Sequence, residues 1–203
     1  MLLAAAFAGP PPDLLARAIA HFRAVDTYRV TLHAVHADGE EQIRYYYKKP
    51  GFVRMEFIRP HPGAVLVYSP VTRRVRLWPF GEGRFPELDL SPRNPLVRSP
   101  RGQNVDRSDV GALFENVRSL LRHGRAEAMG EDSVAGRATQ HLVIVGAPGF
   151  TIAGVHRYDL WLDTSMQFPL KVISRDRDDA VIETVTLDAL EVDVPLADTL
   201  FNP

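Results

Sequence analysis

The spacing of apolar residues changes from helical to alternating early in the chain. Between residues 13 and 25, apolar side chains recur every three or four positions, which predicts an amphipathic helix with Asp13 as its N-cap. Its apolar face comprises Leu14, Leu15, Ala18, Ile19, Phe22 and Val25. From Tyr28 onward, apolar and polar residues alternate, which predicts a strand, and Asp38-Gly39 is typical of a hairpin turn. A β-sheet therefore begins directly after the first helix.

Short alternating segments continue through the first half of the chain. They predict strands at residues 28–34, 43–48, 52–59, 64–68 and 74–78. Consecutive strands joined by tight turns form an antiparallel meander. Residues 79–104 interrupt the alternation of apolar and polar residues, because they are rich in proline, glycine and arginine and have no sustained period. They predict a long loop or flap, with a short strand near Leu88 and Leu90 as the alternative.

A second amphipathic helix is predicted after this loop, capped by Asp106 or Ser108 and ended by His123-Gly124. Its apolar face comprises Val110, Leu113, Phe114, Val117, Leu120 and Leu121. Alternation then returns, which predicts strands at residues 125–134, 136–145, 155–163, 168–175 and 180–194. In the last of these, the apolar positions change parity after Leu187, which predicts a β-bulge or a sharp bend.

This order of elements predicts an α+β fold built on one strongly curved antiparallel sheet of about 10–11 strands. The N-terminal helix and the second helix, acting as a lid or plug, are expected on its concave face. A length of 203 residues fits a single domain, which we place at residues 13–203.

The amino-acid composition excludes several classes of function. The chain has 24 basic and 25 acidic side chains mixed along its length, so no nucleic-acid partner is expected. It contains no cysteine, which excludes disulfides, thiol nucleophiles and cysteine zinc sites.

The first residues resemble the end of a secretory signal, since an apolar run closes with Ala6-Phe7-Ala8 before a proline-rich stretch. We expect residues 1–12 to be the remnant of an export signal plus a linker, and the protein to be periplasmic, exported and soluble. An apolar start to the first helix is the alternative, although Pro10, Pro11 and Pro12 would break such a helix. No apolar run approaches the roughly 20 residues that a membrane-spanning helix needs.

Several short motifs carry a resemblance to a known family. They are Lys49-Pro50-Gly51-Phe52-Val53-Arg54-Met55-Glu56 on a hairpin, Trp78, Leu160-Trp161-Leu162-Asp163, Phe168-Pro169-Leu170-Lys171, Thr186-Leu187 and Pro195-Leu196-Ala197-Asp198-Thr199-Leu200-Phe201. In this order the chain resembles the LolA-like superfamily of periplasmic outer-membrane lipoprotein-sorting proteins. The resemblance implies an unclosed β-barrel whose concave face binds acyl chains beneath a helical lid.

For function, the resemblance implies a non-enzymatic carrier or chaperone that binds a lipid or an acylated lipoprotein. Such a protein would act in outer-membrane lipoprotein or lipid trafficking. No cofactor and no metal are expected, and a monomer that exchanges its cargo with a membrane-protein donor or acceptor fits this role. The alternative is an envelope sensor or regulatory domain that binds a membrane-protein partner. The chain departs from the carrier in having one convincing lid helix and in the arginines of residues 79–104.

Burying an acyl chain gains roughly 0.8 kcal/mol per methylene, so an apolar trough suffices to bind it. The predicted wall comprises Tyr28, Val30, Leu32, Tyr45, Tyr47, Met55, Phe57, Leu77, Tyr158, Leu160 and Leu162, with Phe114, Val117 and Leu121 from the lid helix. Each of these residues alone also fits ordinary core packing. Arg54 is a candidate for headgroup contact near the mouth, with surface solvation as the alternative. The arginines between Arg73 and Arg101 are candidates for anionic headgroups or an acidic partner, or form a solvated loop.

Catalytic interpretations find little support. His33 and His36 lie on opposite faces of a predicted strand, so they cannot chelate one metal ion. Asp159 and Asp163 share a face, but they flank Trp161 on the expected outer side, where a solvated surface is favoured over an acid–base pair. No phosphate-binding loop or nucleophile motif occurs.

Overall fold

The computed structural model describes residues 11–202, so nearly all of the predicted export-signal remnant lies outside the described residues. The first helix, α1 (Pro11–Ala24), takes in Pro11 and Pro12, which we had assigned to the linker. Proline is well tolerated in a first helical turn, where its missing N–H would have no partner within the helix. Asp13 therefore lies in the first turn of α1 and is not its N-cap. Within residues 11–202, no helix is long and apolar enough to span a membrane.

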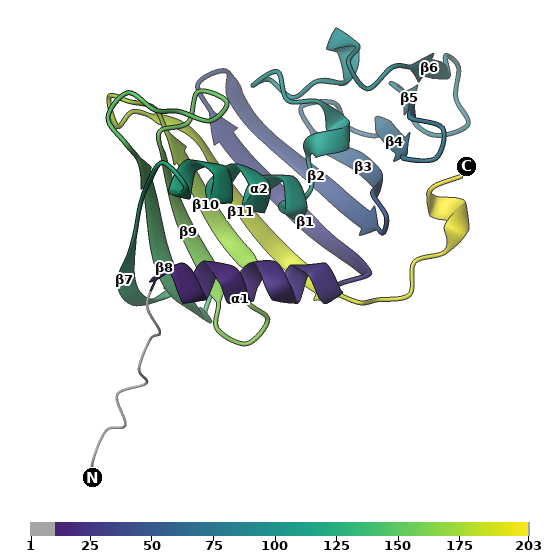
Figure 1. The fold of residues 1–203 in the computed structure, drawn as a ribbon. Coiled ribbons are helices and arrows are strands. Elements are labelled where there is room, and N and C mark those ends of the chain that lie inside the picture. The colour runs from purple at the N-terminus through teal and green to yellow at the C-terminus, as the bar shows by residue number, and fades with distance from the viewer. Residues whose placement is uncertain (1–10, 203) are drawn as a thin grey trace.

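The fold is one 11-stranded sheet with antiparallel pairing throughout, in the order β6-β5-β4-β3-β2-β1-β11-β10-β9-β8-β7 (Figure 1). The first meander is β1 (Thr27–His36), β2 (Gly39–Lys48), β3 (Phe52–Arg59), β4 (Val65–Ser69), β5 (Arg74–Trp78) and β6 (Leu88–Leu90). The second is β7 (Gly124–Val134), β8 (Arg137–Gly146), β9 (Arg157–Asp163), β10 (Pro169–Arg175) and β11 (Val181–Val192). Because β6 and β7 are both edges, the curved sheet stays open, and the predicted α+β unclosed barrel is confirmed.

The two meanders meet where β1 pairs with β11, and this seam carries the predicted bulge. Arg29 pairs with Glu191 and Thr31 with Asp188, so two residues of β11 stand opposite Val30 alone. Ala189 takes up the extra length with a φ of 50°. The bulge resets the alternation, which allows Leu187 and Leu190 to be buried although their parities differ.

Two helices cross the concave face (Figure 1). The second, α2 (Val110–Leu121), is capped by Asp109, whose side chain accepts from the Ala112 amide at 2.7 Å. The predicted caps Asp106 and Ser108 are wrong, because a 3-10 turn, η2 (Val105–Arg107), occupies the residues before the helix. Two further 3-10 turns are η1 (Pro95–Val97) and η3 (Asp198–Leu200).

The helices fill only part of the trough. Helix α2 contacts β7 and β8, and α1 contacts α2 and β7. Between them, Phe22 and Phe114 meet with ring centroids 6.0 Å apart, above Leu142, Ile144 and Leu160, which are fully buried. The part of the concave face that the helices leave uncovered belongs to β1–β5 and to parts of β10 and β11.

Candidate functional site

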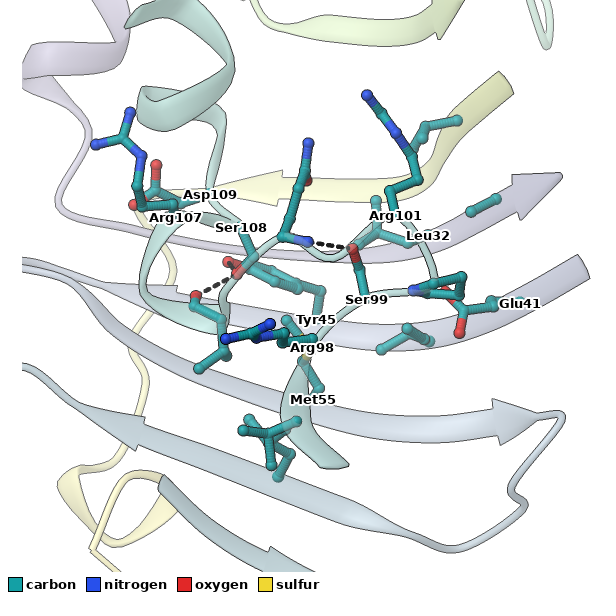
Figure 2. A pocket seen from close by; sticks show the side chains of 18 of the residues that line it. Leu32, Glu41, Tyr45, Met55, Arg98, Ser99, Arg101, Arg107, Ser108 and Asp109 are labelled. Atoms are coloured by element: carbon teal, nitrogen blue, oxygen red, sulfur yellow. Dashed lines mark hydrogen bonds between the residues drawn. The ribbon is translucent and has the colours of Figure 1, made fainter. Parts of the chain in front are cut away.

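A cavity of about 770 Å³ lies over the uncovered part of the sheet. Its apolar walls come from the concave side of β1–β5, β10 and β11: Val30, Leu32, Ile43, Met55, Phe57, Leu66, Leu77, Val172, Val185 and Leu187. Residues 95–109, which we call the roof segment, close it from the other side (Figure 2). A volume of about 300–1,000 Å³ is typical of pockets that take one small ligand.

The roof segment is tied to itself and to the sheet. Arg101 Nη1 lies 2.7 Å from Glu183 Oε2 on β11, and both side chains are mostly covered. The Gly102 amide donates to the Ser99 carbonyl at 2.7 Å, and the hydroxyls of Tyr45 and Ser108 are 3.0 Å apart. These contacts make the roof an ordered wall of the cavity.

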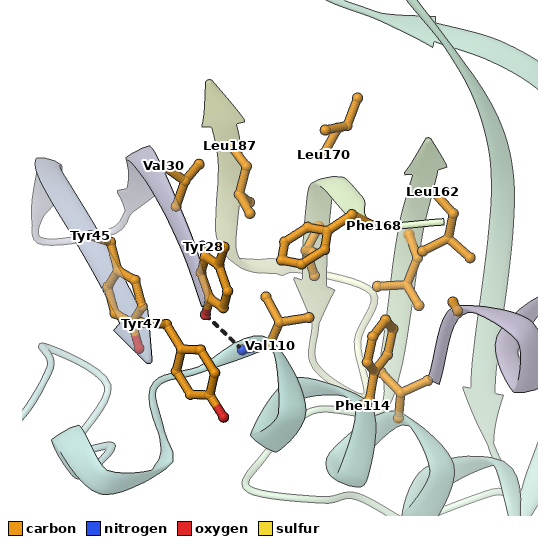
Figure 3. Close-up of a cluster of buried hydrophobic side chains, with 14 of the residues drawn as sticks. Tyr28, Val30, Tyr45, Tyr47, Val110, Phe114, Leu162, Phe168, Leu170 and Leu187 are labelled. Atoms are coloured by element: carbon orange, nitrogen blue, oxygen red, sulfur yellow. Dashed lines mark hydrogen bonds between the residues drawn. The ribbon is translucent and has the colours of Figure 1, made fainter. Parts of the chain in front are cut away.

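Stacked tyrosines lie where the cavity adjoins the helices: Tyr28 and Tyr45 line the cavity, and Tyr47 packs in the core. The Tyr28 ring centroid lies 5.0 Å from that of Tyr47 and 5.9 Å from that of Tyr45, with nearly parallel planes (Figure 3). The Val110 amide, at the start of α2, donates to the Tyr28 hydroxyl at 3.4 Å. Burial raises the pKa of the Tyr28 and Tyr45 phenols far above their usual value, and raises the pKa of Tyr47 to about 12. These three phenols are therefore uncharged at neutral pH.

Polar groups gather at another part of the lining, where Glu41, Arg101 and Glu183 all border the cavity. Burial raises the pKa of the Glu41 carboxyl, with Glu183 adding to the rise and His36 opposing it. Burial also raises the pKa of Tyr158, although Arg101 and Asn116 lower it. The cavity is thus amphipathic, with apolar walls on the sheet, this polar region, and further polar side chains on the roof segment such as Ser99, Gln103 and Asn104.

Comparison with known proteins identifies the family. The model of the MucB/RseB N-terminal domain matches residues 96–203, which is more than half of the chain. This chain belongs to the MucB/RseB N-terminal domain family. No curated protein sequence matches it.

Solved structures with little sequence similarity share the fold of this MucB/RseB domain. An uncharacterized conserved protein from Thermus thermophilus is 14% identical, with a TM-score of 0.57 over 95% of this chain and 92% of that one. Lipoprotein LppX of Mycobacterium tuberculosis is 9% identical, with a TM-score of 0.55 over 93% and 99%. The chain matched in the Pseudomonas aeruginosa MucA/MucB complex is 16% identical, with a TM-score of 0.51; 94% of the present chain spans 60% of its length. The LolA-like fold that the resemblance implies is confirmed.

The structure divides the predicted wall residues of the MucB/RseB domain into two groups. Those that line the cavity are Tyr28, Val30, Leu32, Tyr45, Met55, Phe57, Leu77 and Tyr158. Those packed in the core outside the cavity are Tyr47, Phe114, Val117, Leu121, Leu160 and Leu162. The second group lies beneath or on the helices and belongs to the packed core there.

Sequence analysis missed other lining residues. Ile43 shares the parity of Tyr45 and Tyr47, the predicted wall residues of its strand, so the alternation alone would have found it. Leu187 lies on β11, a strand for which no wall residue is predicted. The roof residues Arg98, Ser99 and Asn104 carry no periodic signal, because they belong to irregular chain.

Arg54 does not line the cavity of the MucB/RseB domain. It alternates with Met55, which faces the cavity, so Arg54 lies on the convex face and the predicted position near the mouth is wrong. It donates to Glu56 at 2.8 Å, to Glu82 at 2.7 Å and to the Leu200 carbonyl at 3.1 Å. Its hydrogen bonds join β3 to the β5–β6 connection and to the 3-10 turn η3 near the C-terminus.

Two carboxylates of β9 are buried on the convex face, so the expected solvated surface is wrong. Asp159 accepts two hydrogen bonds from Arg157 at 2.8 and 2.9 Å and lies 3.5 Å from Arg175, and its side chain is 5% exposed. Asp163 pairs with Arg137 at 2.8 Å. Burial alone would raise the pKa of Asp163, but hydrogen bonds from Met166 and Ser165 hold it below its usual value. Neither carboxylate is free to act as an acid or base.

Trp161 lies between these carboxylates on the same convex face, as expected. Its ring stacks on His141 with centroids 4.1 Å apart, beneath Lys171, and its Nε1 donates to Asp132 at 2.8 Å. His33 of β1 contacts Gln42 and Asp188, whereas His36 contacts Asp38. Among residues 11–202, no group of histidine and acidic side chains is arranged to hold a metal ion.

Proposed function

We propose that this domain is a non-enzymatic, periplasmic binder of a lipid or of the acyl chains of a lipoprotein, acting as a monomeric carrier in lipid or lipoprotein trafficking. The observation that carries the proposal is the cavity of about 770 Å³ with apolar walls on β1–β5, β10 and β11. Each methylene moved from water into such walls gains roughly 0.8 kcal/mol, so the walls need no directional chemistry.

The polar region of the cavity suits the polar end of an amphiphile. Arg101 and Glu183 neutralise each other across 2.7 Å, and Glu41 beside them has a raised pKa because of burial. A ligand carbonyl or hydroxyl can hydrogen-bond to such groups while its chain lies along Leu32, Met55 and Leu66.

Binding rather than catalysis fits the tyrosines Tyr28 and Tyr45 and the arginine Arg101 of the lining. The phenols of Tyr28 and Tyr45 are held un-ionised, and the charge of Arg101 is already engaged by Glu183. General acid–base catalysis needs a group with a pKa near the working pH and within reach of substrate. We therefore assign the cavity a role in ligand binding and not in catalysis.

The direct test is extraction of bound lipid from the purified protein, with identification by mass spectrometry. A matched pair of variants on β1 sharpens it: Leu32→Trp fills the cavity, whereas Val35→Trp adds the same ring at a site that is 53% exposed. We expect Leu32→Trp to weaken binding of a fluorescent fatty acid at least about tenfold and Val35→Trp to leave it unchanged. Equal binding by both variants, with no lipid extracted, would refute the proposal.

A second candidate is a regulatory domain that binds a membrane-protein partner. The observation that favours it is membership of the MucB/RseB family together with the shared fold of MucB, which was solved as a complex with MucA. In-cell crosslinking followed by mass spectrometry distinguishes the two. A regulatory domain would trap one membrane protein in stoichiometric amount, whereas a carrier alone would yield lipid without a single dominant protein.

A further inference from the structure

The mouth of the cavity carries exposed apolar side chains. Phe80 and Leu96 border the cavity, yet they are 64% and 68% exposed. Phe85, on the same β5–β6 connection as Phe80, is 93% exposed. Exposed apolar side chains gathered at one site mark a surface that meets another phase or partner.

Arginines without carboxylate partners accompany these side chains. Every acidic residue between positions 79 and 101 pairs with an arginine of the sheet: Glu82 with Arg54 at 2.7 Å, Glu87 with Arg76 at 3.7 Å and Asp89 with Arg74 at 2.7 Å.

The arginines of residues 79–101 have no carboxylate partner among residues 11–202, apart from Arg101, which pairs with Glu183. Arg84, Arg93 and Arg98 form no ion pair with any carboxylate of residues 11–202. Arg98 borders the cavity, and Arg84 and Arg93 lie on the connections that lead to Phe85 and Leu96, so these connections present positive charge although the whole chain has a net charge of −1.

We propose that this mouth rim, defined as Phe80, Arg84, Phe85, Arg93, Leu96 and Arg98, docks onto an anionic bilayer surface. Aromatic and aliphatic side chains that enter the headgroup region, together with basic residues that meet anionic headgroups, are what interfacial binding requires. The apolar members stand on two separate connections with arginines between them, whereas a protein interface has a closely packed apolar centre inside a polar border.

Docking in this way turns the cavity opening toward the membrane. The surface does not depend on what the cavity holds, so this inference goes beyond the proposed lipid binding. Phe85 and Arg84 do not line the cavity, which allows the surface to be altered while the site beneath it stays intact.

The test is flotation of the full chain with phosphatidylcholine vesicles, with and without phosphatidylglycerol. We expect binding that requires phosphatidylglycerol and weakens with salt. An arginine near an anionic surface contributes roughly a fivefold change in partitioning, so Arg84→Gln/Arg93→Gln should lose about 25-fold. Phe85→Ser should reduce binding further.

Matched controls lie at the opposite end of β5, in the turn before it. Val71 is 77% exposed, and Arg73 forms no ion pair with a carboxylate of residues 11–202. Val71→Ser/Arg73→Gln should bind vesicles as the wild type does.

The inference would be overturned by absence of vesicle binding, by equal binding to neutral vesicles, or by equal losses in rim and control variants. Capture of an acidic membrane protein through the rim, without vesicle binding, would also overturn it. Leu32→Trp separates the two proposals, because it should lose the fatty-acid probe and still float with anionic vesicles.

Discussion

Arg101 on the roof segment and Glu183 on β11 form an ion pair of 2.7 Å across the edge of the cavity, with side chains only 12% and 15% exposed. This pair joins irregular chain to the strand at the seam of the two meanders. Removal of one partner from a mostly covered pair leaves the other charge without compensation, which costs more than the pair itself contributes.

We therefore expect Arg101→Met to lower the free energy of unfolding by roughly 1–3 kcal/mol, less than the loss at a fully buried pair. Amide exchange at Gly102 and Gln103 should accelerate, because their bonds to Ser99 depend on the position of the roof. Urea unfolding and hydrogen exchange provide the measurements.

The control is Arg107→Met, which breaks a pair of similar length, 2.8 Å to Glu115, whose side chains are 54% and 58% exposed. It should cost less than about 1 kcal/mol. The double variant Arg101→Met/Glu183→Leu should recover most of the stability; a double variant as unstable as Arg101→Met would show that lost packing, not the unpaired charge, explains the effect.

The convex-face carboxylate Asp159 should matter for stability and not for ligand binding. Asp159→Asn leaves Arg157 and Arg175 without their shared acceptor, so we expect a loss of roughly 2–4 kcal/mol in urea unfolding. Asp178→Asn, in the exposed turn that follows β10, is the control and should be neutral. Unchanged stability in Asp159→Asn would mean that the guanidinium groups find other partners.

Alkaline pH should destabilise the fold through its tyrosines. All 6 tyrosines of the chain have a pKa raised primarily by burial, and for Tyr47 it reaches about 12. A raised pKa in the folded state means that the stabilising contribution is complete below about pH 10, the usual value for an unfolded chain. It is lost as pH rises above that value toward the folded pKa.

Ultraviolet titration of tyrosinate checks this prediction. The folded protein should show little ionisation near pH 10 and then a steep transition that coincides with loss of the circular dichroism signal. The same titration in denaturant should give the ordinary value near 10. Independent ionisation of most tyrosines near pH 10, with the fold intact, would contradict the burial of these rings.

The two groups of wall residues should respond differently to truncation. Phe114→Ala opens a hole in packed core and should cost about 3–5 kcal/mol. Leu77→Ala, at a partly exposed cavity wall, should cost much less and should alter fatty-acid affinity instead. Unfolding curves and probe titrations on both variants make the comparison; a large change in affinity for folded Phe114→Ala would place the ligand beneath α2.

Most of the fold was predictable because it rests on local periodicity. Residues 52–59 and 74–78 were predicted as strands and became β3 and β5 with the same limits. The parity change after Leu187 marked the bulge at Ala189, since a β-bulge leaves a direct trace in the alternation. The helix start at Val110 was harder to predict, because Asp106, Ser108 and Asp109 are all good caps and only the η2 turn selects among them.

The site was predictable only in part. Alternation placed Leu32, Met55 and Leu77 on the concave face, but Phe114 and Leu160 share the same pattern and are core. The partners of the buried Asp159 come from β8, β9 and β10, and no local signal in the sequence gives the register that brings them together.

The sequence by itself determined the order of helices and strands, the curvature at the seam and the face on which each strand residue lies, because these depend on neighbours in the chain. Only the tertiary structure decided where the helices stop covering the trough and which acidic residues compensate which arginines. Those outcomes depend on the volume and charge that distant segments bring to one place. The proposed function rests on those outcomes, since they leave a cavity with apolar walls beneath the roof segment and arginines without carboxylate partners on the connections beside it.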